Sequence, residues 1–301
     1  MPRTASEQAL IERFSRTYRH LTQSETMLGI ERAVCGCDYG CTSWTTREEA
    51  DDIGNILGLG PATRYLEIGA GSGWPGLYLA KRTGCEAALI DLPLEGLQAA
   101  RERATKDGLA DRCRIVQADG AALPFAGGGP GGSGGFDAIY HSDVLCCLIE
   151  KQAVLEECRR IAGDEAKMVF SVISIAPGLS DADYETAAAG GPTFIESPMD
   201  YAEMLTHTGW TVTARGDVTA EYSENFGKMF GFEKANIDEF ERVLAEYLVT
   251  PAIEDFKIAN TGGKGFHFIR LGQQPGCNID FAGTDFQQQL QKVGNEGAFF
   301  A

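Results

Sequence analysis

Three glycines stand where a short apolar segment gives way to a helical pattern. Gly69, Gly71 and Gly73 follow the segment 64–68 and precede the segment 75–83. Glycine lets the backbone turn sharply, and a helix amino terminus carries roughly half a positive charge, so a ligand can lie directly on main-chain N–H groups. The spacing therefore predicts a binding loop for a nucleotide-type ligand.

These glycines alone leave two kinds of cofactor open. Gly71, Gly73 and Gly76 fit the G-x-G-x-x-G pattern of dinucleotide-binding folds, and Asp91 follows 20 residues after Gly71. An NAD(P)-dependent oxidoreductase is therefore one alternative.

Acidic residues at the ends of the next segments separate the alternatives. Glu67 lies near the end of the first apolar segment, Asp91 ends the second, and Asp119 follows the third, just before Gly120. In doubly wound sheets, ligands bind beside the carboxyl ends of the strands. These acids are therefore candidates for binding the same ligand as the glycine loop.

The motifs around these positions resemble those of class I S-adenosylmethionine (SAM) dependent methyltransferases. The resemblance is to the small-molecule group that includes ubiquinone-biosynthesis and glycine/sarcosine-type enzymes. The matching motifs lie at 66–73, 89–92, 118–125 and 136–145, in the order and spacing of the family. The resemblance covers residues 60–175 and implies SAM as cofactor and S-adenosylhomocysteine (SAH) as product.

The resemblance implies how the first glycine loop would bind the cofactor. Gly69, Gly71 and Gly73 would hold the methionine part of SAM, and Glu67 would orient the loop. Asp91 would accept hydrogen bonds from both ribose hydroxyls, a task that suits a carboxylate because it is an acceptor with two oxygens.

The remaining cofactor residues implied by the resemblance would contact the adenine. Leu92 would pack on the ring, Asp119 would accept the adenine amino group, and the Gly120 N–H would approach the ring edge.

Candidate catalytic residues are His141 and Tyr39. His141 lies at the carboxyl end of the fourth apolar segment, where an imidazole could take a proton from the acceptor and also contact the cofactor. The alternative is a packed histidine. Tyr39 and Trp44 lie in the segment that, in similar enzymes, forms a lid, and their rings could enclose a sulfonium or a cationic substrate.

The amino-terminal cysteines do not match a common metal motif. Cys35, Cys37 and Cys41 have the spacing C-x-C-x3-C, which is not typical of zinc sites, and no second Cys or His cluster follows nearby. We therefore expect no metal.

A second group of thiols keeps another acceptor chemistry open. The segment around Cys146 and Cys147 resembles that of arsenite methyltransferases, although Asp143 stands where their metalloid-binding cysteine would be. Methylation of a thiol or metalloid is therefore an alternative.

Alternating strand and helix patterns must position these residues. They predict a doubly wound, Rossmann-like α/β fold with a mostly parallel sheet. Strands are expected at 64–68, 87–90, 113–117, 136–140, 168–175, 210–214 and 265–271. The resemblance implies seven strands with the last one antiparallel.

Three regions are expected along the chain. Residues 1–60 would form a helical cap or lid and residues 61–275 the SAM-binding methyltransferase domain, with a helical insertion at 180–260 forming the substrate wall. Residues 276–301 would be a tail, and the glycine-rich segment 126–135 a surface linker.

The net charge of the chain restricts the classes of partner that it is expected to bind. The 301 residues include 26 Lys and Arg against 43 Asp and Glu, a net charge of −17. This disfavours binding to nucleic acid or to an anionic membrane and leaves a small molecule as the expected partner. Nine cysteines and no apolar leader or membrane span predict a cytoplasmic protein.

We therefore interpret the sequence as a methyltransferase (EC 2.1.1) that transfers the methyl group of SAM to an oxygen or nitrogen of a small molecule. A non-catalytic, SAM-binding regulatory subunit is a further alternative. The sequence sets no oligomeric state.

Overall fold

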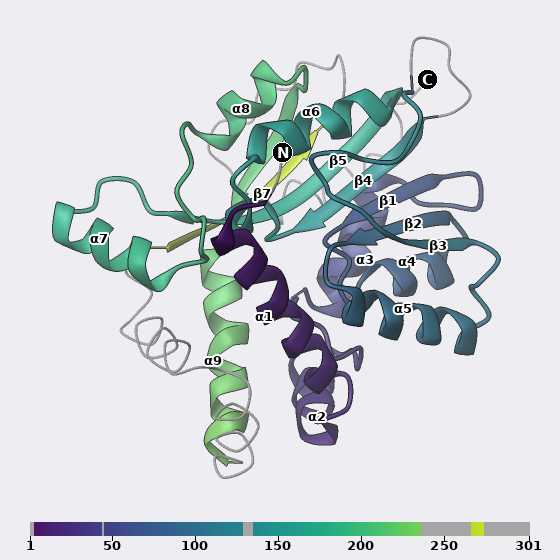
Figure 1. The fold of residues 1–301 in the computed structure, drawn as a ribbon, viewed down its shortest axis with the longest axis horizontal. Helices are drawn as coiled ribbons and strands as arrows, with labels where there is room; N and C mark the ends of the chain where they lie inside the picture. Colours follow the sequence, from purple (N-terminus) through teal and green to yellow (C-terminus); the bar gives the residue numbers. More distant parts are fainter. Residues whose placement is uncertain (1–2, 44, 129–134, 236–265, 274–301) are drawn as a thin grey trace.

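The structure is a computed structural model that describes residues 3–43, 45–128, 135–235 and 266–273. A single sheet of seven strands, in the order β3-β2-β1-β4-β5-β7-β6, forms its centre (Figure 1). The strands are β1 (Arg64–Ile68), β2 (Glu86–Asp91), β3 (Cys113–Gln117), β4 (Phe136–Ser142), β5 (Ala162–Ile175), β6 (Val212–Asp217) and β7 (Phe266–Gln273).

Strands β1 to β5 run parallel to one another, whereas β7 pairs antiparallel with both β5 and β6. The mostly parallel, Rossmann-like α/β fold expected from the sequence is confirmed. The carboxyl ends of β1, β2, β3 and β4 meet at one edge of the sheet, because neighbouring parallel strands run in register. That edge carries the candidate site.

The helices lie on both faces of the sheet and beyond its carboxyl edge (Figure 1). They are α1 (Ala5–Leu21), α2 (Glu25–Val34), α3 (Arg47–Leu57), α4 (Gly76–Thr83), α5 (Leu94–Lys106), α6 (Lys151–Ile161), α7 (Asp181–Gly190), α8 (Tyr201–His207) and α9 (Thr219–Ala235). Among the described residues, every helix is too short or too polar to span a lipid bilayer.

Period-two alternation along the central strands builds two separate cores. Leu66 and Ile68 of β1 face a core shared with α6 and α8, whereas Tyr65 faces one shared with α3, α4 and α5. The same alternation places Ile139 of β4 in the first core and Tyr140 in the second. Both faces of the sheet are therefore buried, as a parallel sheet requires.

Two helices have no clear pattern in the sequence, and two strands begin two or more residues away from the expected positions. Helix α2 buries only Ile30 and Glu31, and α7 buries only Ala187, so neither has the continuous apolar face that a sequence pattern would reveal. Strand β6 begins two residues later than the expected 210–214, and β5 begins at Ala162, six residues before the expected 168–175. The tail 276–301, most of the 126–135 linker and the insertion beyond Ala235 lie outside the described residues.

Candidate active site

The glycine loop after β1 has the left-handed backbone that its residue types allow. Gly69, Gly71 and Gly73 have φ values of 73°, 50° and 96°. A Cβ at Gly69 would lie 2.3 Å from a methyl carbon of Val144, and one at Gly71 would lie 2.4 Å from the Tyr18 hydroxyl. The loop is therefore packed between the residues after β4 and helix α1, with no space for a side chain.

Asp91 ties the end of β2 to this loop. One carboxylate oxygen accepts the Gly71 N–H at 2.8 Å, and the other accepts the Leu92 N–H at 2.7 Å. Removal from water raises the pKa of Asp91 to about 6, although the two amide donors act in the opposite direction. A carboxylate has about four acceptor positions, so Asp91 can bind ligand hydroxyls in addition.

Glu67 lies beneath the loop and is only 2% exposed. Its Oε2 accepts the Tyr65 hydroxyl at 3.3 Å, and its carboxylate also accepts the Gly76 N–H at the start of α4. A Cβ at Gly76 would lie 1.9 Å from Oε2, which explains why that position is glycine. Burial raises the pKa of Glu67 to about 8.

A pocket of about 170 Å³ opens beside these groups, at the carboxyl edge of the sheet. Gly69, Asp91, Leu92 and Asp119 line its walls. Gly120 is buried behind it, where a Cβ would lie 3.2 Å from Ile68. The pocket therefore brings together the loop, the β2 acid and the β3 acid that the sequence singled out.

Helix α1 and the segment before it cover this pocket. Arg3 forms an ion pair with Asp119 at 2.9 Å, and Arg19 forms one with Glu95 of α5 at 2.6 Å. Between these two ion pairs, the buried Tyr18 hydroxyl lies 3.0 Å from that of Thr42. Sequence reasoning did not identify Arg3 or Thr42 as site residues, because neither belongs to a motif.

A second pocket of about 230 Å³ adjoins the first. Gly69, Tyr18 and Asp143 line both pockets. Ser142 and Cys147 also line both, whereas Arg13, Cys41, Gly71, Cys146 and Tyr222 line only the second of the two. A ligand in each pocket would therefore meet beside the glycine loop.

Asp143 has an unusual backbone at this junction. Its φ of 53° makes it the one non-glycine residue with a positive φ among the described residues. Its carboxylate accepts the hydroxyls of Ser171 at 3.2 Å and Ser142 at 3.4 Å. Strained backbone of this kind is typical of functional sites. The only sequence signal for it was its position directly after β4.

His141 lies away from both pockets. Its side chain is fully buried and stacks on the Phe170 ring at a centroid distance of 4.5 Å. Neither ring nitrogen has a hydrogen-bond partner within the described parts of the chain, and burial lowers the pKa of His141 to about 3. This environment is unfavourable for the proton transfer expected from the sequence.

Tyr39 also lies outside the two pockets. Its ring packs 5.3 Å from that of Trp74, and the Arg103 guanidinium lies 4.0 Å from its centroid. Burial raises its pKa to about 12. The cation that this ring meets is therefore an arginine of the chain itself. Trp44, the third lid residue expected to contact the cofactor, lies outside the described residues.

Comparison with known families identifies this arrangement. A family model described as a methyltransferase domain matches residues 66–170, the stretch from the glycine loop to β5. It begins with the first motif, at residue 66, and contains all four. The chain carries a class I methyltransferase domain. Members of this family use SAM, so the expected class of cofactor is confirmed.

Curated relatives of this methyltransferase domain differ in how much of their length the chain matches. Methyltransferase GfsG of Streptomyces halstedii is 26% identical over 125 residues, which are 42% of this chain and 43% of that protein. Sarcosine/dimethylglycine N-methyltransferase of Halorhodospira halochloris is 24% identical over 222 residues, 69% of this chain and 73% of that protein. This chain thus spans less than half the length of the first relative.

Solved structures share the fold of the methyltransferase domain. Geranyl diphosphate methyltransferase in complex with SAM has a TM-score of 0.62 at 16% identity, covering 84% of this chain and 92% of its own. The [4+2]-cyclase SpnF has a TM-score of 0.66 at 16% identity, covering 84% and 93%. A cyclase among these neighbours indicates that the fold alone does not specify the reaction.

Proposed function

We propose that this chain transfers the methyl group of SAM to an oxygen or nitrogen of a small molecule. The observation that carries the proposal is the junction of two pockets at Gly69, Tyr18 and Asp143. The first pocket has the acids Asp91 and Asp119 that suit a nucleoside, whereas the second is lined by Gly71 of the loop together with Cys146 and Tyr222. A donor and an acceptor bound in them would meet at this junction.

The residues of the first pocket fit SAM. Gly69, which lines this pocket, and Gly71, which lines the second, form a cradle that a Cβ would fill, and Asp91 has acceptor positions for paired hydroxyls beyond its two amide donors. Leu92 offers an apolar surface for adenine, and Asp119 an acceptor for its amino group. When bound, SAM supplies an electrophilic methyl group on a positively charged sulfur.

The loop itself is held by Glu67 and Gly73. Glu67 accepts the Gly76 N–H and so ties β1 to α4, and the Gly73 N–H donates to the Ala70 carbonyl at 2.7 Å in the turn between them. We assign both residues to positioning the loop, together with Gly120 behind the adenine side.

The second pocket would bind and orient the acceptor. Asp143 presents a carboxylate at the junction, which can accept a hydrogen bond from an amine or hydroxyl nucleophile. Helix α1 covers the junction through Tyr18 and so excludes water. Alignment of two reactants in a closed site supplies much of the rate of a direct displacement. We assign no catalytic role to His141 or Tyr39, because neither lines a pocket.

Equilibrium binding followed by turnover tests this proposal. We expect SAM and SAH to bind by titration calorimetry and Asp91→Ala to abolish detectable binding. Glu86→Ala, at the exposed opposite end of the same strand, is the matched control and should bind normally. A screen of small amines, phenols and carboxylic acids for SAH release then identifies the acceptor. Binding of NADH instead of SAM would establish the oxidoreductase alternative.

A thiol or metalloid acceptor is the second candidate, and one observation favours it. Cys41, Cys146 and Cys147 all line the second pocket, although they come from distant segments. Thiolates bind soft acceptors. SAH release with arsenite or a small thiol, lost in Cys147→Ser and absent with every amine and phenol, would replace the main proposal by this one.

SAM binding without turnover of any acceptor would support a regulatory subunit. We further propose that the chain is divided into a cap, a methyltransferase domain and a tail. We also propose a cytoplasmic location.

A further inference from the structure

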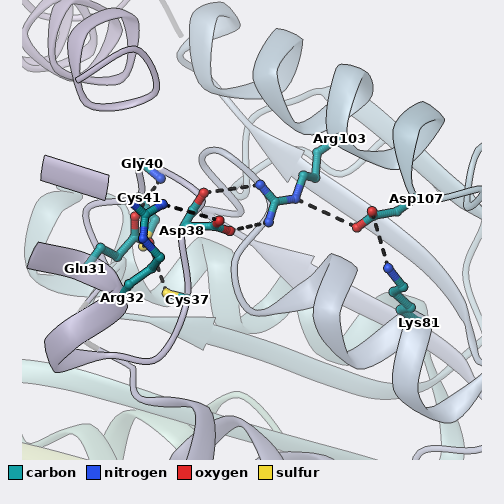
Figure 2. Close-up of polar contacts among 9 residues, drawn as sticks. All are labelled: Glu31, Arg32, Cys37, Asp38, Gly40, Cys41, Lys81, Arg103 and Asp107. Carbon is teal, nitrogen blue, oxygen red and sulfur yellow. Dashed lines mark hydrogen bonds and ion pairs between the residues drawn. The ribbon is translucent and has the colours of Figure 1, made fainter. Parts of the chain in front are cut away.

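Helix α2 and the loop after it bring three metal-binding side chains together, apart from the two-pocket junction. The ligating atoms of Glu31, Cys37 and Cys41 all lie within 4.8 Å of one another (Figure 2). Glu31 and Cys37 line neither pocket, and the proposed methyl transfer uses neither of them.

The Glu31 carboxylate is the centre of this cluster. Its Oε1 accepts the Cys41 thiol at 2.8 Å and the Cys37 thiol at 3.0 Å, while Oε2 accepts the Gly40 N–H at 2.7 Å. Two thiols thus converge on a single oxygen. The glutamate is only 8% exposed and Cys37 only 3%.

Glu31 lacks a cationic partner in the part of the chain that the structure describes. The guanidinium groups of Arg32 and Arg103 both pair with Asp38 instead (Figure 2). Arg103 also pairs with Asp107, which in turn pairs with Lys81, on the side away from Glu31 (Figure 2). A buried carboxylate held only by neutral donors, two of them weak thiol donors, is costly. A bound cation would remove that cost.

The loop is shaped to bring the cysteines back to the helix. Gly36 and Gly40 have φ values of 72° and 62°, and a Cβ at Gly40 would lie 2.5 Å from the backbone of Thr22. Because the loop comes back so close to Thr22, the Gly40 N–H points at Glu31. Cys41 then also lies beside Glu31, which is ten positions earlier in the chain. The convergence therefore depends on a specific backbone path.

A further thiol lies beside Cys37. Cys35 is 3% exposed and interacts with Cys37, although its thiol is not among the three ligating atoms that all lie within 4.8 Å of one another. Both pack against Ala50 and Trp74 in a small separate core. Three thiols and one carboxylate, shielded from water, offer four donors of the kinds that bind tetrahedral zinc. The carboxylate favours zinc over copper(I), which prefers soft ligands alone.

We propose that Glu31, Cys37 and Cys41, with Cys35 as the fourth ligand, bind a structural zinc ion. Binding displaces the thiol protons and involves no change of oxidation state. The ion would fix the loop against α2, and with it Cys41, Thr42 and Ser43 of the second pocket wall. The expectation of no metal considered cysteine spacing alone and did not include a ligand on the preceding helix.

Metal analysis of the protein as purified tests this site. We expect one zinc per chain by mass spectrometry of the metal content. After exchange with cobalt(II), we expect the visible bands of a tetrahedral ion and a thiolate charge-transfer band in the near ultraviolet. Removing zinc with a chelator should lower the Tm, and adding zinc should restore it.

Variants locate the ligands. Glu31→Gln and Cys37→Ser should each weaken zinc binding at least about tenfold. Cys113→Ser is the control, because that buried thiol lies on β3 outside the cluster, and it should leave zinc binding unchanged. SAM binding by Glu31→Gln should persist, which separates this site from the methyl-transfer proposal.

Two results would overturn the zinc site. One is wild-type protein that contains no zinc after expression with zinc and shows no tetrahedral cobalt spectrum. The other is protein purified without air that has a disulfide between Cys37 and Cys41. Both measurements use the wild-type chain, so they hold even where a variant fails to fold.

Discussion

Arg3 and Asp119 form an ion pair at 2.9 Å that joins the segment before α1 to the end of β3. Both side chains are 38% exposed, so the pair contributes at most about 1 kcal/mol to stability. Asp119 is also the acid proposed to bind the adenine amino group. With SAM bound as proposed, Arg3 and the cofactor would therefore share one carboxylate.

This sharing predicts opposite effects of two substitutions. Asp119→Ala should weaken SAM binding about tenfold, the loss of one charge-assisted hydrogen bond. Arg3→Ala should leave the Tm nearly unchanged and should bind SAM as tightly as the wild type or more tightly, because Asp119 no longer has a competing partner. Titration calorimetry measures both. A loss of affinity in Arg3→Ala as large as that in Asp119→Ala would indicate that Arg3 itself binds the cofactor.

Asp91 predicts that cofactor binding depends on pH. Its pKa of about 6 in the free protein means that the carboxylate gains a proton below that pH and loses its capacity to accept two hydroxyls. SAM affinity should therefore fall as the pH drops through about 6. Asp91→Asn should bind about 10–100-fold more weakly at pH 8 and show a flatter pH profile. An unchanged profile in Asp91→Asn would assign the dependence to another group.

Glu67 predicts the pH dependence of stability. Its pKa is raised from 4.5 in water to about 8 in the fold, so the folded state holds a proton that the unfolded state releases. Its contribution is fully present below about 4.5 and is lost as the pH rises through about 8. The free energy of unfolding in urea should therefore fall across this range, and Glu67→Gln should reduce that slope. Glu86→Gln, exposed on β2, should retain it.

Alanine substitutions at Gly71 and Gly108 separate the steric cost of an added Cβ from the cost of backbone strain. Gly71→Ala requires a Cβ 2.4 Å from the Tyr18 hydroxyl at a φ of 50°, whereas Gly108→Ala has a similar φ of 71° and no heavy atom within 4 Å. The second change should cost about 1–2 kcal/mol of stability through backbone strain alone. The first should cost more and should also abolish SAM binding. Urea unfolding and calorimetry on both variants measure the difference, and equal losses would show that Tyr18 simply moves aside.

His141 predicts a result that distinguishes a packed histidine from a base. Its pKa is lowered from 6.5 to about 3, so the folded state binds fewer protons than the unfolded state between these values. Stability should therefore fall as the pH drops below 6.5, and His141→Phe should remove this part of the slope while it keeps the stacking on Phe170. SAM binding and the pH profile of kcat should stay unchanged. A large fall in kcat with intact SAM binding would restore His141 as the base.

The positions of the glycine loop and of the acids beside it were predictable from the sequence. Gly69, Gly71, Asp91 and Asp119 belong to short motifs at strand ends, and their positions follow from local rules. A parallel sheet brings consecutive strand ends to one edge, and a glycine turn before a helix exposes its N–H groups. Contacts made by the backbone and by residues adjacent in sequence follow from local spacing, so a single sequence is enough to predict them.

The rest was decided by tertiary packing. His141 was a candidate because it lies at the end of β4. In the structure its ring faces the core and stacks on Phe170, whereas Asp143, two residues later, lies at the pocket junction. The alternation of side chains along a strand sets the direction in which each one points, and a match to a sequence motif does not take that direction into account. Likewise, Arg3 meets Asp119, and Glu31 meets Cys41, only because separate segments fold back on one another. Such pairings depend on the whole backbone path, which local residue patterns do not specify.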